Sequence, residues 1–365
     1  MVRKNDESVI KAKTLGADFA IVRLQGHNHS TISARMSQTG SQADLQIAQA
    51  LAAYAQGDWP TGWRLFEARH DPDWARRYGW SQTKRNLTEF ARPASTEAPA
   101  LTDLLIVAEG GAGDTIQFTR YLPLLRAKLP QARLVFEVQN QLLELIRQLP
   151  GMDGIEIIQR TAADGTIFPI SSEIHHVLPL LSLPTWLGLT LQDQIPPPPP
   201  FPRTHQPPKD GKLHIGFCWR TDPNNKLDPG RDVPLAALLP IINHPQIVAT
   251  SLLDDMTPEE IGSAPRLRRF SAIAGRIPFT QIATIIQQQH VVIACDTAWP
   301  NLSATLGIPT LMLTLKEPNW RWGLSGETTP WYPAMTLLRQ TQKGDWREPI
   351  SRASAIIDRL LNPSA

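Results

Sequence analysis

The chain has 365 residues, of which 42% are hydrophobic and 19% are charged. This length predicts two domains, and this composition is typical of a soluble globular protein. The 36 basic and 34 acidic residues nearly balance, which argues against a nucleic-acid-binding protein. The sequence has no apolar run near the roughly 18 residues of a membrane-spanning helix.

The cysteine count and the first residues of the chain help to predict the cellular compartment of the protein. Cys218 and Cys295 are the only cysteines, so we expect neither a disulfide framework nor a cysteine zinc site. The first twenty residues lack the apolar core of a signal peptide. We therefore expect a cytoplasmic protein without a transmembrane segment.

Residues 1–42 are polar and mixed, and we predict a weakly ordered arm there. His27 and His29 lie in this arm and could suggest a metal site. Two histidines in a stretch rich in serine and asparagine are more often exposed to solvent, so we expect no metal.

Residues 43–95 predict a helical segment. Apolar residues recur every three or four positions from Leu45 onward, which is typical of an amphipathic helix. The turn at Gly57 and Asp58 is followed by Pro60, which suits the first turn of a second helix. One helix pair cannot form a solenoid, so we expect this hairpin to pack against the next domain, and it could also bind a protein partner.

Residues 96–195 alternate strand and helix patterns, which predicts a parallel sheet with crossover helices. The strand candidates are residues 101–109 and 132–138, and residues 155–160 and 175–181 are further short apolar runs. The helix candidates are Thr115 to about Lys128 and residues 140–149. The proline-rich residues 196–211 follow. They fit a semi-stiff interdomain linker better than a docking peptide, because a new strand begins immediately afterwards.

Residues 212–365 repeat the alternation. Strand candidates are residues 212–219, 245–253, 290–297 and 308–315, and helix candidates are residues 234–243, 279–289, the segment after Cys295, and 350–361. The fold expected is therefore two Rossmann-like domains that face each other across a cleft, with ligands beyond the carboxyl ends of the strands.

A glycine-rich loop follows the first predicted strand. It begins EGGAGDT and comprises Glu109, Gly110, Gly111, Gly113, Asp114, Thr115 and Gln117. Its spacing fits neither a dinucleotide fingerprint nor a P-loop. Asp114 could take a proton from an acceptor hydroxyl. The spacing alone favours a helix N-cap at Asp114 with Gln117 as its capping-box partner.

Two loops of the second half could bind a diphosphate. Arg220, Lys226 and Arg231 follow a buried strand, where cations suit a diphosphate, although an ordinary solvated loop fits equally well. Asp296 or Thr297 can cap a helix with Pro300 in its first turn; the free amides of such a helix start suit a phosphate.

Other residues have competing interpretations. Trp320, Arg321, Trp322, Trp331 and Tyr332 lie within a short segment, which fits a sugar-facing surface or equally well core packing. Cys218 and Cys295 fit small buried strand residues better than nucleophiles, because no histidine accompanies them in an evident motif.

These loops resemble, in order, those of bacterial proteins that join tetratricopeptide repeats to a GT-B glycosyltransferase domain. The string EGGAGDTIQFTRYLPLL resembles the family's glycine-rich segment, ACDTAWPNLSATLGIPT its D-T-A helix, and NWRWGLSGETTPWYPAMTLLRQ its closing tryptophan segment. The domain is related to the heptosyltransferases of glycosyltransferase family 9 and, distantly, to O-GlcNAc transferase. The resemblance covers roughly residues 45–360.

The resemblance implies an inverting, metal-independent transfer of a sugar from a nucleotide-diphosphate sugar to a hydroxyl acceptor, a glycan or a protein. It implies no cofactor besides this co-substrate. Asp114 matches the family's catalytic base. Lys226 and Arg231 match cations that offset charge on the leaving diphosphate, and Asp296 and Thr297 match the start of the helix that holds the donor.

This sequence departs from the family at the donor loops. Trp219 is kept, but Arg220 and Thr221 follow it where the family has Ser or Ala and then Gly. Asn225 and Asn301 replace two histidines, and asparagine cannot carry the charge that a histidine can. Two hypotheses follow: a glycosyltransferase, or a degenerate GT-B protein that acts as a binding or scaffolding subunit. A dehydrogenase is a distant third, because the glycine fingerprint is missing.

Overall fold

The computed structural model describes residues 41–78, 92, 94–162, 164–190, 195–221, 230–270 and 277–362. Nearly all of the predicted N-terminal arm, with His27 and His29, lies outside these residues, as do Asn225 and Lys226 of the second loop. Within the described part, no helix is both long and apolar enough to cross a membrane.

The described residues of the first half form a parallel sheet of four strands in the order β3-β2-β1-β4. The strands are β1 (Asp103–Val107), β2 (Arg133–Val138), β3 (Ile155–Gln159) and β4 (Val177–Pro179). Both predicted strands are confirmed, and the two further apolar runs contain β3 and β4. β1 and β2 are almost continuous apolar runs, as expected for parallel strands buried on both faces. From β1 the sheet extends on one side through β2 to β3, and β4 is then added on the other side of β1. The carboxyl ends of β1 and β4 therefore form a topological switch point.

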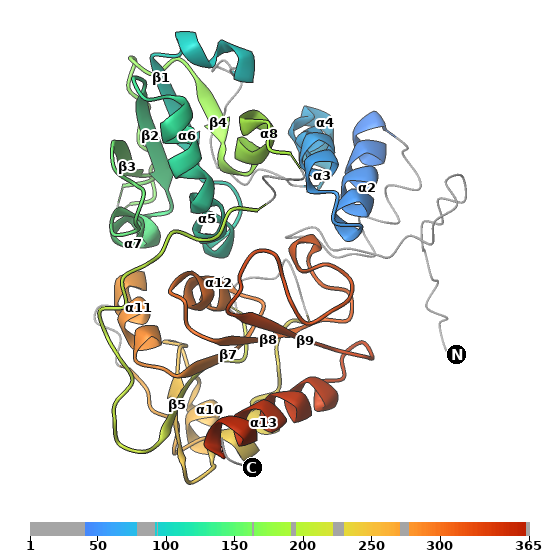
Figure 1. Ribbon diagram of the computed structural model, residues 1–365, viewed down its shortest axis with the longest axis vertical. Coiled ribbons are helices and arrows are strands. Elements are labelled where there is room, and N and C mark those ends of the chain that lie inside the picture. Colours follow the sequence, from blue (N-terminus) through green and yellow to red (C-terminus); the bar gives the residue numbers. More distant parts are fainter. Residues whose placement is uncertain are drawn as a thin grey trace.

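The helices of this half cover the sheet (Figure 1). They are α5 (Ala112–Phe118), η3 (Thr119–Tyr121), α6 (Leu122–Lys128), η4 (Asn140–Leu142), α7 (Leu143–Arg147), η5 (Leu180–Ser182) and α8 (Leu183–Leu187). The helix predicted from Thr115 begins three residues earlier and ends at Lys128 as expected. A 3-10 turn interrupts it before Pro123, which has no N–H to continue the α-helical pattern.

In the second half, the part of the chain that the structure describes forms a parallel sheet of five strands in the order β6-β5-β7-β8-β9. The strands are β5 (Leu213–Cys218), β6 (Ile247–Ser251), β7 (Val291–Cys295), β8 (Thr310–Thr314) and β9 (Met335–Arg339). The four predicted strands are confirmed, and β9 is an additional edge strand. Here the switch point lies between β5 and β7.

The helices of the second half include the four that the sequence predicts. They are α9 (Leu235–Ile242), α10 (Pro258–Ser263), α11 (Phe279–Gln287), α12 (Ala298–Thr305), η6 (Trp320–Trp322) and α13 (Arg347–Leu361); α10 and η6 were not predicted. Residues 196–209 contain neither helix nor strand and connect the two halves. The Arg203 guanidinium holds this connection against α11 by donating to the carbonyl oxygens of Gln287 and Gln289, each at 3.2 Å.

The N-terminal helices form the predicted hairpin and continue beyond it. They are α2 (Gln42–Ala55), α3 (Trp59–Phe66), η1 (Glu67–His70), α4 (Pro72–Tyr78) and η2 (Ser95–Ala100). The hairpin contacts both halves rather than only the next one. The Tyr54 ring stacks on Trp320 of the second half with 4.3 Å between centroids, and the Trp63 ring meets Tyr121 of the first half edge-on at 6.3 Å. Its relation to tetratricopeptide repeats, and the domain limits, stay predictions.

Candidate functional site

The glycine-rich loop places Asp114 inside α5 and not at its N-cap. Gly111 occupies the cap position in an extended conformation, and its N–H donates to Asp114 Oδ2 at 2.7 Å. The predicted N-cap at Asp114, with Gln117 as its partner, is therefore wrong. Gly110 has φ +82°, and a Cβ there would overlap the Asp114 carboxylate. The two glycines before Ala112 thus let the chain turn tightly around this carboxylate.

The Asp114 carboxylate forms an ion pair with Arg321 of the second half. Both residues are buried, at 2% and 3% exposure. Arg321 also donates from Nη1 to Asn319 Oδ1 at 2.9 Å, and its guanidinium lies 4.3 Å from the centroid of the Trp320 ring. The carboxylate expected to face an acceptor is therefore shielded from solvent by a cation from the opposite half.

Helices α5 and α12 touch directly at Gly113. A Cβ at Gly113 would lie 3.0 Å from Asn301 Nδ2 and 3.3 Å from Ala298 Cα, so glycine is what permits this approach. Asn301 donates from Nδ2 to the Thr297 carbonyl oxygen at 3.0 Å, and its buried Oδ1 has no hydrogen-bond partner among the described residues. The predicted acceptor and donor sides thus meet without a gap at this point.

The residues expected at the donor helix gather beyond the carboxyl ends of β5 and β7. Thr297 is the N-cap of α12 and accepts the Trp299 N–H at 3.4 Å. Arg231 donates from Nη1 to the Asp296 carbonyl oxygen at 2.7 Å, and Trp322 donates from Nε1 to Asp296 Oδ2 at 2.9 Å. The structure therefore brings Arg231, Asp296 and Thr297 together at the second switch point.

Trp219 and Arg220 face α10 instead. Trp219 Nε1 and Arg220 Nε both donate to Glu260 Oε1, at 2.7 and 2.8 Å, and Arg220 Nη1 donates to Asp255 Oδ2 at 3.2 Å. Partial burial raises the pKa of Glu260, but the hydrogen bonds from Arg220, the Thr257 N–H and Trp219 together outweigh it, and the net pKa is lowered. Two carboxylates thus offset the charge of Arg220, in contrast to its expected role toward a diphosphate.

The two cysteines are buried at the ends of the central strands. A hydrogen bond with Cys218 and burial raise the pKa of the Cys295 thiol well above its ordinary value. A thiol held in its protonated form is a poor nucleophile, which agrees with the interpretation of these cysteines as strand residues.

The tryptophan segment is core rather than a sugar-facing surface. Trp320, Trp322, Trp331 and Tyr332 are all buried. Arg120 of the first half lies 4.7 Å from the centroid of the Tyr332 ring, and its Nη1 donates to the carbonyl oxygens of Pro196 at 2.9 Å and Trp331 at 2.7 Å. This segment therefore packs between the two halves and the linker and stabilises their contact.

Glu109 lies in a buried network that the sequence analysis did not foresee. Arg69 of η1 donates to both of its carboxylate oxygens, at 2.9 and 3.0 Å, and to Ser182 Oγ at 2.8 Å. Burial lowers the pKa of Arg69, but Glu109 and Glu67 outweigh this and raise it. The network lies beyond the carboxyl ends of β1 and β4, so the hairpin occupies the switch point of the first sheet. No local motif signals this pair, whose members are 40 residues apart.

Thr115 and Gln117 are also buried in α5. Thr115 Oγ1 donates to Gln139 Oε1 at 2.9 Å, and Gln139 Nε2 donates to the Gly110 carbonyl oxygen at 3.2 Å. The buried Nε2 of Gln117 has no hydrogen-bond partner within the described part of the chain. These contacts hold the glycine-rich turn against the end of β2.

Comparisons with known proteins give one relative in sequence. No protein-family model matches the chain. It is 24% identical over 350 residues to Protein FlbA of Caulobacter vibrioides, a match that covers 89% of this chain and 57% of that protein. The chain therefore spans little more than half the length of this curated relative.

Solved structures with a similar arrangement include two bacterial transferases. The glycosyl transferase family 9 protein from Veillonella parvula is 11% identical, with 72% of this chain and 98% of that chain covered and a TM-score of 0.49. ADP-heptose lipopolysaccharide heptosyltransferase II from E. coli is 14% identical, with 72% and 98% covered and a TM-score of 0.46. An O-GlcNAc transferase mutant from Thermobaculum terrenum is 13% identical, with 80% and 73% covered and a TM-score of 0.28. Likeness at this level assigns no family.

Proposed function

We propose that the chain is a glycosyltransferase that moves a sugar from a nucleotide-diphosphate sugar to a hydroxyl of a glycan or a protein. The observation that carries this proposal is the contact between α5 and α12. Helix α5 follows β1 and helix α12 follows β7, and both helices start at this contact. It brings Gly113, the residue before Asp114, against Thr297, Ala298 and Asn301. A donor bound at the second switch point and an acceptor bound at Asp114 would meet beside this contact.

The donor diphosphate would bind at the start of α12. The first amides of this eight-residue helix and the guanidinium of Arg231 supply hydrogen-bond donors and positive charge. Charge on the departing nucleoside diphosphate would be offset by Arg231 and by Lys226, which lies outside the described residues. This assignment needs no metal ion, in keeping with an inverting, metal-independent transfer.

Asp114 would act as the base. Its carboxylate takes the proton of the acceptor hydroxyl, the acceptor oxygen bonds to the anomeric carbon, and the bond from that carbon to the diphosphate breaks with inversion. A carboxylate paired with a guanidinium is a weakened base, so in this proposal the acceptor displaces Arg321 from Asp114.

Replacing Asp114 by Asn tests this role. We expect transfer to be abolished and the affinity for the nucleoside diphosphate to be kept, because the amide has the same size but cannot accept the proton. Product formation and nucleotide affinity are measured on the same preparation, so that loss of the catalytic step can be distinguished from loss of the folded structure. Unchanged turnover would remove Asp114 from the base role.

A second candidate function is a degenerate GT-B protein that serves as a binding or scaffolding subunit. The buried Asp114–Arg321 ion pair favours it, because in this pair the Asp114 carboxylate joins the two halves and so has a structural role. A thermal-shift panel of UDP, GDP, ADP and CMP compounds separates the candidates. A ligand at a hundred times its Kd stabilises a protein by about 2.7 kcal/mol, and no shift with any nucleotide would favour the scaffold. A protein partner on the outer face of the helical hairpin and a cytoplasmic location remain proposals.

A further inference from the structure

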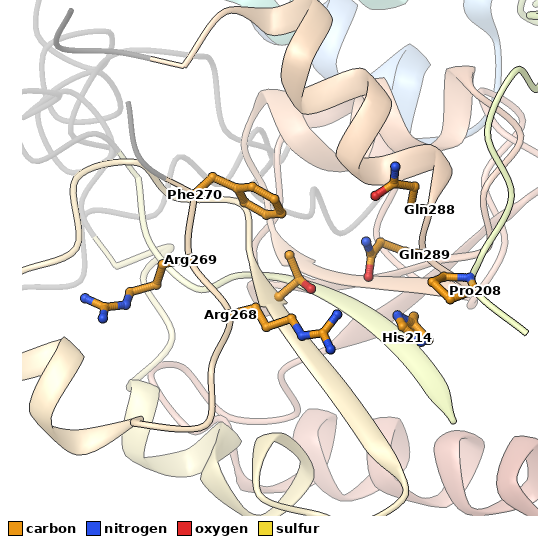
Figure 2. A pocket seen from close by; sticks show the side chains of 8 residues that line it. Pro208, His214, Arg268, Arg269, Phe270, Gln288 and Gln289 are labelled. Carbon is orange, nitrogen blue, oxygen red and sulfur yellow. The ribbon is translucent and has the colours of Figure 1, made fainter. Parts of the chain in front are cut away.

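A cavity of about 280 Å³ lies on the second half, away from the candidate donor site. Figure 2 shows the side chains around it, including Pro208, His214, Thr250, Arg268, Phe270 and Gln289. His214 is the second residue of β5, and Gln289 lies two residues before β7. The residues expected to bind the donor follow the carboxyl ends of these strands, so the cavity is a separate place on the same sheet.

The strand register shows which residues form the floor of the cavity. Thr250 of β6 pairs with Gly216 of β5 on one side and with Arg268 on the other. Paired residues on neighbouring strands point to the same face, and Gly216 contributes no side chain to this row. A Cβ at Gly216 would lie 3.3 Å from Gln289 Cγ, so glycine lets Gln289 come close to the sheet.

Three polar groups of the cavity lack partners among the described residues. Gln289 is 3% exposed; its Nε2 donates to the Ile285 carbonyl oxygen at 2.7 Å, but its buried Oε1 accepts no hydrogen bond. Thr250 is also 3% exposed, and neither its hydroxyl nor the Arg268 guanidinium forms a side-chain hydrogen bond or ion pair in the described part of the chain. A buried acceptor without a donor is costly, and an unpaired guanidinium suits an anion.

We propose that this cavity binds a sugar phosphate. The phosphate pairs with Arg268, sugar hydroxyls donate to Gln289 Oε1 and bond with Thr250, and the C–H face of the sugar packs on the Phe270 ring. Figure 2 shows the Arg268 guanidinium and the Phe270 ring on the cavity side. The volume lies at the small end of ligand sites, which fits a monosaccharide phosphate better than a whole nucleotide sugar.

Calorimetric titration of the full chain with glucose 1-phosphate tests the proposal. We expect saturable binding that weakens about tenfold or more in Arg268→Gln, because a charged hydrogen bond is lost. Thr250→Val, which keeps the side-chain shape, should also weaken binding. Arg266→Gln is the control: this exposed arginine lies two residues before Arg268 but does not line the cavity, and its loss should leave the affinity unchanged.

Several results would overturn the proposal. These are no saturable binding to the unaltered chain at millimolar concentrations, equal weakening by Arg268→Gln and Arg266→Gln, or inorganic phosphate binding as tightly as glucose 1-phosphate. Thermal unfolding of each variant checks that the fold is kept. Because the cavity is separate from the donor site, glucose 1-phosphate binding should persist in a variant that has lost nucleotide binding.

Discussion

The two sheets of this protein each have a switch point, and the chain uses the two places differently. At the first, between β1 and β4, Arg69 of the helical hairpin is buried against Glu109 and Ser182. At the second, between β5 and β7, Arg231 lies half-buried against the Asp296 carbonyl oxygen. The first position is thus filled by a fully buried ion pair, whereas at the second a half-buried arginine lies beside the start of a helix.

This difference assigns separate tasks to the two halves. A buried charge pair with complete hydrogen bonding fixes the hairpin in one place and leaves little room for a ligand. A helix start with a nearby, partly exposed arginine can still take a phosphate. The first half therefore contributes Asp114 and a rigid frame, and the second half contributes the proposed donor site.

The largest expected effect comes from removing the cation of the first switch point. Arg69→Met leaves the Glu109 charge buried without its partner, which we expect to destabilise the fold by about 3–5 kcal/mol. Urea unfolding measures this. Adding Glu109→Gln to Arg69→Met should recover part of the lost stability, because the unpaired buried charge is then removed.

Arg76→Met is the control for that experiment. Arg76 pairs with Asp73 on the surface, where the two side chains are 77% and 75% exposed, and exposed pairs contribute about 0–1 kcal/mol. If Arg69→Met were as mild as Arg76→Met, the hairpin would not be held by this network.

A smaller effect is expected where the two halves touch. Gly113→Ala places a methyl group within 3.3 Å of Asn301 and Ala298, and we expect a loss of about 1–3 kcal/mol from overpacking. Gly262→Ala in α10 meets nothing within 4 Å and should be neutral or gain up to about 1 kcal/mol. Thermal unfolding of both variants shows whether α5 and α12 remain in contact in solution; equal behaviour would contradict this contact.

The smallest effect is a pH dependence from His70. Burial, and next to it the charge of Arg69, hold the pKa of His70 well below its ordinary value of 6.5, with Glu109 opposing them. The folded chain therefore binds fewer protons than the unfolded chain below about pH 6.5, and stability is lost as the pH falls through that range. The slope is at most about 1.4 kcal/mol per pH unit for one proton.

His70→Gln should flatten this part of the stability curve, measured by urea unfolding between pH 7 and 5. His205→Gln is a control, because His205 is exposed and its ring contacts the Thr204 hydroxyl rather than a charged group within the described residues. An unchanged slope in His70→Gln would show that other groups cause the dependence.

The sequence predicted the two sheets well because parallel buried strands are continuous apolar runs between helical patterns. It missed β9, whose residues Met335–Arg339 form a short edge strand after the tryptophan segment. It also misplaced the cap at α5, because Gly111 has no side chain to mark the position that it takes.

The site was predicted less completely, for a physical reason. The partners of Asp114 and Glu109 are Arg321 and Arg69, which tertiary packing brings together and no local spacing encodes. The capping residue Thr297 was foreseen as one of two options, since an N-cap is a local feature. The contacts between the two halves could be identified only from the structure.

The most direct test of the central claim is calorimetric binding of nucleoside diphosphates to the full chain. We predict that one of UDP, GDP or ADP binds, and that Arg231→Gln weakens it about tenfold or more. Arg359→Gln, which changes an exposed arginine of α13, should leave the affinity unchanged. Absence of binding by all three, or equal affinity in Arg231→Gln and the unaltered chain, would contradict a donor site at the second switch point.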